Sequence, residues 1–160
     1  MTLTRFRTCL LALFMIPCAC GGDTDLVREG YLRNHPAVSL GGGFDSLLDD
    51  ANWKAVEGTR GERIVLVSGT VKRAHPMFPI LKLAMQFKFA TMGGDPSGCV
   101  NQMFNADRQP RLVATFLISN DDVSFELGTL TLQPDLDPPA GCQVTFDPKQ
   151  RDAFFDDLLK

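Results

Sequence analysis

Few of the patterns that mark enzymes, nucleic-acid binders or membrane-spanning proteins occur in this 160-residue sequence. It has only two histidines and contains no C-x-x-C, G-x-S-x-G or G-x-x-x-x-G-K-[ST] motif. Its longest apolar run, residues 9–16, is far shorter than the about 20 residues that a spanning helix needs. Basic residues do not cluster beyond the N-terminus, and the net charge is −3. We therefore expect no nucleic-acid partner, no cofactor and no metal site.

Candidate catalytic groups are equally scarce. His35 and His75 each precede a proline, and we expect both in exposed loops. The acidic pairs 49–50, 121–122 and 156–157 consist of sequence neighbours, whose side chains point in different directions on a helix or strand. They are typical of solvated ends and turns rather than of a carboxylate dyad. The sequence therefore predicts that this protein is not an enzyme.

The N-terminal 19 residues have the layout of a secretory signal peptide. Arg5 and Arg7 precede the apolar run at residues 9–16, which Pro17 ends. Small residues follow the proline, as at a cleavage site. We therefore expect the chain to be exported.

Residues 17–20, Pro-Cys-Ala-Cys, resemble the lipobox of bacterial lipoproteins. The resemblance implies that Cys20 carries the lipid, including palmitate, and becomes the first residue after cleavage. Two or more acyl chains would then hold the protein on a membrane, since one chain gives only reversible attachment. Gly21, rather than an aspartate, implies the outer membrane where the host has two. The alternative is an ordinary cleavage near Gly22, which would release a soluble secreted protein.

Five cysteines occur in the chain. Cys9 and Cys18 would leave with the signal peptide, and Cys20 would carry the lipid. Cys99 and Cys142 would then remain in a compartment where disulfides persist, and we predict that they pair. The alternative is two separate buried thiols.

Alternating and β-branched residues predict a β-sheet. Residues 62–73 are apolar on both faces, which is typical of a central strand covered on both sides. Residues 80–90 alternate strictly between apolar and other side chains, which predicts a strand with one wet face. The predicted strands are residues 62–73, 80–90, 111–119 and 123–132, with a short edge strand at 143–146. Short links between them favour an antiparallel meander.

Helices are predicted at both ends of this sheet. Residues 44–51 place apolar side chains on one helical face, and Trp53 follows as a core anchor. Asp147 and Pro148 are typical of the start of a C-terminal helix. The expected fold is α+β, with a short N-terminal helix packed on a four- to five-stranded antiparallel meander, plus a C-terminal helix. The expected organisation is a signal peptide at 1–19, a lipidated tether and flexible lead-in at 20–43, and one globular domain at 44–160.

Residues 44–71 resemble the helix–tryptophan–strand opening of small uncharacterised extracytoplasmic bacterial proteins. That resemblance implies no catalytic residue. We expect a non-catalytic cell-envelope lipoprotein, membrane-bound through Cys20, that binds a partner protein or scaffolds an envelope complex. The alternatives are a binder of small apolar ligands, lined by some of the 12 phenylalanines and 6 methionines, and a secreted inhibitor of a hydrolase. The oligomeric state stays open.

Replacing the proposed lipidation site tests the anchor. We expect Cys20→Ser to move the protein from the membrane fraction to the soluble fraction, because the variant has no sulfur to acylate. Fractionation, together with the mass of the mature N-terminus, measures this. A variant that stays on the membrane would contradict lipidation of Cys20.

Overall fold

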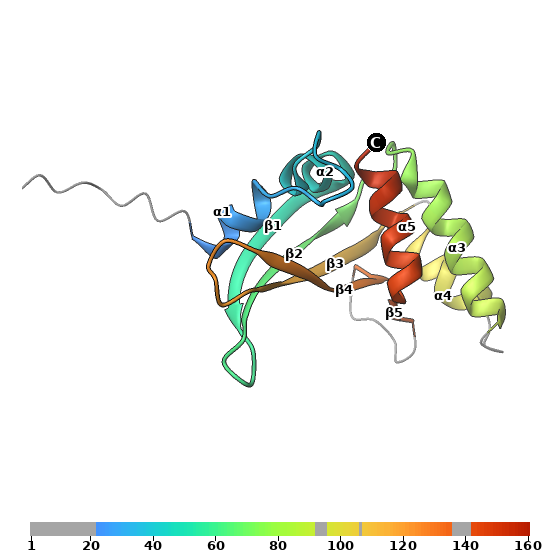
Figure 1. The fold of residues 1–160 in the computed structure, drawn as a ribbon. Helices are drawn as coiled ribbons and strands as arrows, with labels where there is room; N and C mark the ends of the chain where they lie inside the picture. Colours follow the sequence, from blue (N-terminus) through green and yellow to red (C-terminus); the bar gives the residue numbers. More distant parts are fainter. Residues whose placement is uncertain (1–21, 92–95, 106, 136–141) are drawn as a thin grey trace, which may run out of the picture.

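A five-stranded antiparallel sheet with helices packed against it forms the computed structural model, which describes residues 22–91, 96–105, 107–135 and 142–160 (Figure 1). The elements in chain order are α1 (Asp23–Arg28), α2 (Leu40–Leu47), β1 (Leu48–Glu57), β2 (Arg63–Val71), α3 (Met77–Thr91), α4 (Pro96–Met103), β3 (Pro110–Ile118), β4 (Phe125–Pro134), β5 (Val144–Thr145) and α5 (Pro148–Leu158). The predicted α+β class is confirmed, with the antiparallel meander and the C-terminal helix. None of the described helices is long and apolar enough to span a membrane.

The strands follow one another across the sheet in the order β1-β2-β3-β4-β5. Val67 on β2 pairs with Ala114 on β3, and Leu112 on β3 pairs with Leu132 on β4. The central position of β2 is confirmed. The prediction that β2 is covered on both sides is not confirmed, because Val65 and Val67 are buried whereas Ile64 on the opposite face is only partly buried. The helices α3 and α4 form the long connection between β2 and β3.

The core is centred on Phe44 of α2, which is fully buried. Its ring makes edge-to-face contacts with Trp53 on β1, Phe116 on β3 and Phe155 on α5, at centroid distances of 5.6, 6.2 and 5.9 Å. Aromatic pairs prefer this geometry because the positive ring edge meets the negative face of its neighbour. One side chain therefore holds two helices against two strands.

The predicted helix at residues 44–51 is wrong in its boundaries. Helix α2 begins after Ser39, whose hydroxyl accepts a hydrogen bond from the Gly42 backbone at 3.1 Å, and it ends at Leu47. The chain then continues directly into β1, where Trp53 lies. Backbone pairing with β2 outweighs the helical spacing of a few apolar side chains. Gly43 allows close packing here, because a Cβ in its place would lie 2.6 Å from the Leu159 side chain.

The predicted strand at residues 80–90 is wrong, because this segment forms most of helix α3. Two residues correspond to a rotation of about 200° around a helix, so alternate apolar side chains fall on two opposite faces. Leu81, Met85 and Phe89 face the core, whereas Leu83 and Phe87 face outward. The same alternation that indicates one apolar face of a strand therefore gives two apolar faces on a helix.

The segment expected as a flexible lead-in contributes structure over its described part. Val27 of α1 is fully buried. Asp23 of α1 accepts a hydrogen bond from Arg63 Nε of β2 at 2.9 Å, and Arg63 also pairs with Asp122 in the turn before β4. The hydrogen bond from Arg63 lowers the pKa of Asp23. These contacts fix α1 against the sheet.

The predicted disulfide is present between Cys99 of α4 and Cys142 before β5, with a Cα–Cα distance of 5.2 Å. The predicted start of the C-terminal helix is also confirmed. Asp147 and Gln150 form a reciprocal capping box, and Pro148 is the first residue of α5. The disulfide therefore ties α4 to the strand that precedes α5.

Truncating the central aromatic side chain should destabilise the fold. We expect Phe44→Ala to lower the free energy of unfolding by about 3–5 kcal/mol, because it removes a buried ring and leaves a cavity. Urea denaturation measures the change. Phe87→Ala is the matched control, because Phe87 is 66% exposed and its truncation should change stability by less than about 1 kcal/mol. An equal decrease in the free energy of unfolding of the two variants would contradict this description of the core.

The disulfide closes a loop with a sequence separation of 43 residues. The chain-entropy model predicts that Cys99→Ser with Cys142→Ser lowers the free energy of unfolding by about 4 kcal/mol. Thermal melting of the oxidised protein, the reduced protein and the double variant measures this. The reduced protein should melt like the double variant. An unchanged melting temperature after reduction would rule out a stabilising bridge.

Candidate functional site

Of the site residues predicted from the sequence, Cys20 lies outside the described residues. Cys99 and Cys142 are joined to each other. A bridged cysteine has no thiolate with which to attack a substrate or bind a metal. These two residues therefore serve the fold.

The two histidines lie in loops, as predicted, but neither is fully exposed. His35 Nε2 is 2.8 Å from Asp156 Oδ1 of α5, and the His35 side chain is only 16% exposed. His75 Nδ1 accepts a hydrogen bond from the Met77 backbone at 3.2 Å, at the start of α3. Partial burial, and secondarily Lys72, lower the pKa of His75. Both histidines therefore hold loops against helices.

The acidic pairs do not converge on a common point. Asp121 receives hydrogen bonds from the side chain and backbone of Ser124 and from the backbone of Val123, which close the β3–β4 turn and lower the pKa of Asp121. Asp157 accepts a hydrogen bond from Lys160 at 2.6 Å. Among the residues that the structure describes, no group of three or more His, Cys, Asp and Glu side chains could hold a metal ion.

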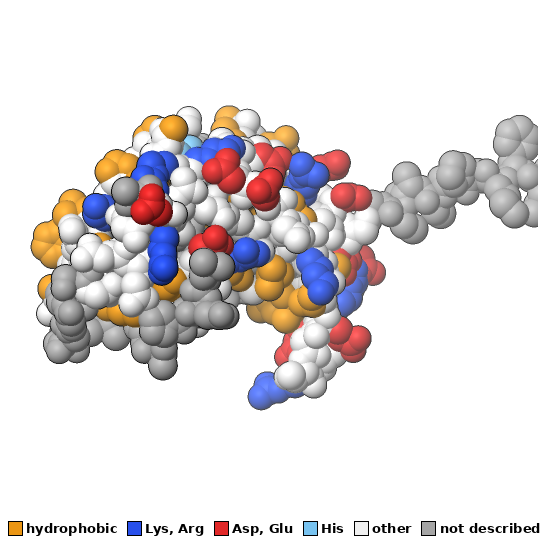
Figure 2. Space-filling model, turned by 180° about the vertical axis from the view of Figure 1, so that it is seen from behind, with side chains coloured by type: hydrophobic (Ala, Val, Ile, Leu, Met, Phe, Trp, Pro, Cys, Tyr) orange, Lys and Arg blue, Asp and Glu red, His pale blue; other side chains and the backbone are white. Residues whose placement is uncertain are grey.

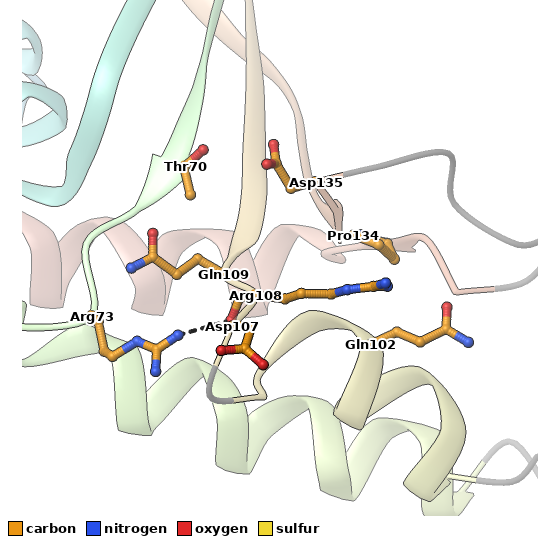
Figure 3. Close-up of a pocket in the computed structure, with 8 residues that line it drawn as sticks. All are labelled: Thr70, Arg73, Gln102, Asp107, Arg108, Gln109, Pro134 and Asp135. Carbon is orange, nitrogen blue, oxygen red and sulfur yellow. Dashed lines mark hydrogen bonds between the residues drawn. The ribbon is translucent and has the colours of Figure 1, made fainter.

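A polar cleft of about 420 Å³ lies where the ends of β2 and β4 and the start of β3 meet α4 (Figure 3). Its lining residues are Thr70, Arg73, Gln102, Asp107, Arg108, Gln109, Pro134 and Asp135. The Arg73 guanidinium donates to the carbonyl oxygens of Asn105 at 2.9 Å and Arg108 at 3.2 Å. Arg73 therefore holds the segment that leads into β3.

The chemistry of this cleft is limited. Its two arginines are balanced by two aspartates, so it has no excess charge to attract an ion. Its lining contains no histidine, cysteine or serine, on which nucleophilic catalysis most often depends. The cleft offers hydrogen bonds to a polar molecule.

The outer side of α3 is the most unusual surface of the described residues. Its exposed side chains, called here the α3 face, are Pro79, Ile80, Leu83, Ala84, Gln86, Phe87, Ala90 and Thr91. None of them is charged. Ile80 is 50% exposed, Leu83 55% and Phe87 66%. A surface helix normally turns charged and polar side chains to water, and a helix that is apolar all round is normally buried.

A shallow apolar groove of about 200 Å³ runs beside the α3 face, between α3 and α5. Its lining residues are Met77, Ile80, Leu81, Ala84, Met85, Lys88, Phe146, Gln150, Ala153, Phe154 and Asp157. Lys88 Nζ donates across it to the Thr145 carbonyl at 2.7 Å and lies 3.3 Å from Gln150 Oε1. The two charged groups of the groove, Lys88 and Asp157, come from different helices.

The neighbouring helix α5 differs from α3, because charged side chains lie on its exposed side. The exposed positions of α5 include Lys149, Asp152, Asp156 and Asp157. In Figure 2, hydrophobic side chains gather along the edge where α3 lies after the half turn, while acidic and basic side chains are scattered over the rest of the visible surface. The α3 face and the groove are therefore the candidate site for contact with another molecule.

No protein-family model, curated protein or solved structure matches this chain. The site is therefore defined by its own geometry.

Sequence reasoning missed the α3 face because it assigned residues 80–90 to a strand. A signal for the helix was present. Leucine, methionine, alanine, lysine and glutamine, which have high helix propensity, dominate this segment, and Ile80 is its only β-branched residue. Pro79 is compatible with the helix because it lies in the first turn.

Proposed function

We propose that this protein is a non-catalytic cell-envelope lipoprotein, anchored through Cys20, that binds a partner protein through the α3 face. The single observation that supports binding there is the absence of charge on the exposed side of α3. Contiguous apolar surface on a folded protein marks sites of contact with other molecules.

The energetics favour covering this surface. Fully burying an isoleucine, leucine or phenylalanine side chain contributes about 1.5–3 kcal/mol. Ile80, Leu83 and Phe87 are half to two-thirds exposed, so a partner that covers them gains about 1 kcal/mol or more from each. An interface with three such side chains at its centre resembles the aromatic and aliphatic centre of protein–protein contacts.

The position of α3 suits a tethered protein. Figure 1 shows α1, at the N-terminal end of the described residues, and α3 at opposite ends of the molecule. A tether that precedes residue 22 would leave the α3 face at the far end of the domain, accessible to a partner in the envelope.

The size of the groove bears on the alternative of a small apolar ligand. At about 200 Å³ it is below the roughly 300 Å³ at which pockets for drug-sized ligands begin. A single protein side chain fits it better. The alternative of a hydrolase inhibitor depends on loops at residues 92–95 and 136–141, which lie outside the described residues.

Site-specific photocrosslinking in cells tests the proposal. A photoreactive amino acid at position 83 or 87 of the full chain should crosslink to protein, because both side chains lie on the α3 face. The matched control is position 152, an aspartate 73% exposed on α5, which should give at least about tenfold less product.

A second experiment distinguishes a loss of binding from a loss of folding. Phe87→Asp should abolish crosslinking from position 83, while its urea midpoint stays close to that of the unmodified chain, since Phe87 lies outside the core. Crosslinking that is equal at positions 83 and 152, or that survives Phe87→Asp, would refute the α3 face as the binding surface.

A further inference from the structure

We propose that the partner of the α3 face is a second copy of this chain, packed across a two-fold axis so that Phe87 of each copy enters the α3–α5 groove of the other. The inference rests on the proposed function and names the occupant of the same surface. Four features support it: the spacing of the apolar side chains, the shape of the surface, the charges of the adjacent groove and the absence of charge on the α3 face itself.

The spacing of the apolar side chains suits helix-to-helix packing. Ile80, Leu83 and Phe87 lie at positions i, i+3 and i+7, so they form one stripe along the outside of α3. This is the spacing by which two helices interlock their side chains along a common seam. Ala84 beside the stripe is small enough to let a second helix approach closely.

The shape of the face is self-complementary. Phe87 is the most exposed phenylalanine on α3 and projects as a knob, while the groove beside Ile80 and Ala84 is a recess of about 200 Å³. Phe87 and the groove residues Ile80 and Ala84 lie on α3, about two turns and about one turn apart. A two-fold axis between positions 83 and 84 of antiparallel α3 helices places Phe87 of each copy opposite position 80 of the other. The knob and recess then meet twice, as a two-fold interface requires.

The two charged groups of the groove, Lys88 and Asp157, are complementary in the same two-fold arrangement. Lys88 contacts Gln150 near the start of α5, whereas Asp157 lies near the end of α5. Figure 1 shows the C-terminal end of α5 beside the start of α3, so the two helices run in opposite directions. Lys88 and Asp157 therefore lie toward opposite ends of the groove. The two-fold axis brings Lys88 of each copy toward Asp157 of the other, where the pair would exchange the bonds to Gln150 and Lys160 made within each chain.

The absence of charge on the α3 face also favours self-association. The whole chain carries a net charge of −3, so most pairs of identical surfaces would bring acids together. The α3 face has no acidic side chain, so two copies would meet there without electrostatic repulsion at the centre of the interface. Tethering to a membrane would raise the effective concentration of one copy near another, so that even a weak interface would be occupied.

Disulfide trapping tests the arrangement in the full-length, membrane-anchored protein. Ala84→Cys places a new thiol beside the axis, while Cys99 and Cys142 are already bridged. We expect a disulfide-linked band of twice the mass on a non-reducing gel. Asp152→Cys is the exposed control and should give at least about tenfold less dimer. Phe87→Asp in the Ala84→Cys background should lower the dimer by about tenfold or more, because it removes the knob.

A charge exchange tests the register. One tagged chain carries Lys88→Asp and a differently tagged chain carries Asp157→Lys, each with Ala84→Cys. Either chain alone brings like charges together at both ends of the interface, whereas the mixed pair restores opposite charges at both. We expect the mixed dimer to exceed the random proportion several-fold. A random distribution of tags would overturn the proposed packing.

The failure of this inference differs from the failure of the proposed function. Photocrosslinking from position 83 or 87 to a different protein, with no dimer from Ala84→Cys, would refute the second copy and leave the binding surface intact. Labelling of lipid alone from these positions, with no protein product, would refute both and assign the α3 face to the membrane surface.

Discussion

The packing of Phe44 is the interaction on which the rest of the structure depends. A single buried ring contacts Trp53, Phe116 and Phe155, which belong to β1, β3 and α5. Phe116 and Phe155 are far from Phe44 in the sequence, so these contacts close long loops of the chain at one place. Helix α2 is otherwise a weak helix, with three glycines among its eight residues, and tertiary packing rather than helix propensity keeps it in place.

The connection between β2 and β3 is made by two helices. Adjacent antiparallel strands need only a short turn, yet this chain inserts α3 and α4 between them. The disulfide from Cys99 to Cys142 ties α4 to the segment before β5, and the edge-to-face contact of Phe78 with Phe104 joins α3 to the end of α4. Because α3 is packed on its inner side by Met77, Leu81, Met85 and Phe89, its outer side has no covering element among the described residues.

The functional proposals follow from the contrast between this outer side and the remaining surface. The histidines and acidic pairs are engaged in loops, turns and ion pairs. In the polar cleft two arginines balance two aspartates, and Arg73 donates hydrogen bonds to the backbone beside it. An apolar helix face in water is costly unless something covers it, because hydrophobic burial is the main favourable term in association. The α3 face therefore offers a surface for contact with another molecule.

Local sequence signals determined those elements whose structure depends on nearby residues. The strand-forming segments at residues 111–119 and 123–132, Asp147 with Pro148, and the number of cysteines predicted two strands, the last helix and the disulfide. Tertiary structure decided β1, and it added to local helix propensity in deciding α3. Pairing with β2 extends residues 48–57 into a strand, and packing against α4 and the core selects the helix for residues 80–90. An alternating apolar pattern by itself fits one face of a strand or two faces of a helix. The position of the core distinguishes the two, because burial of apolar surface is a property of the whole fold. The α3 face is visible only once that distinction is made.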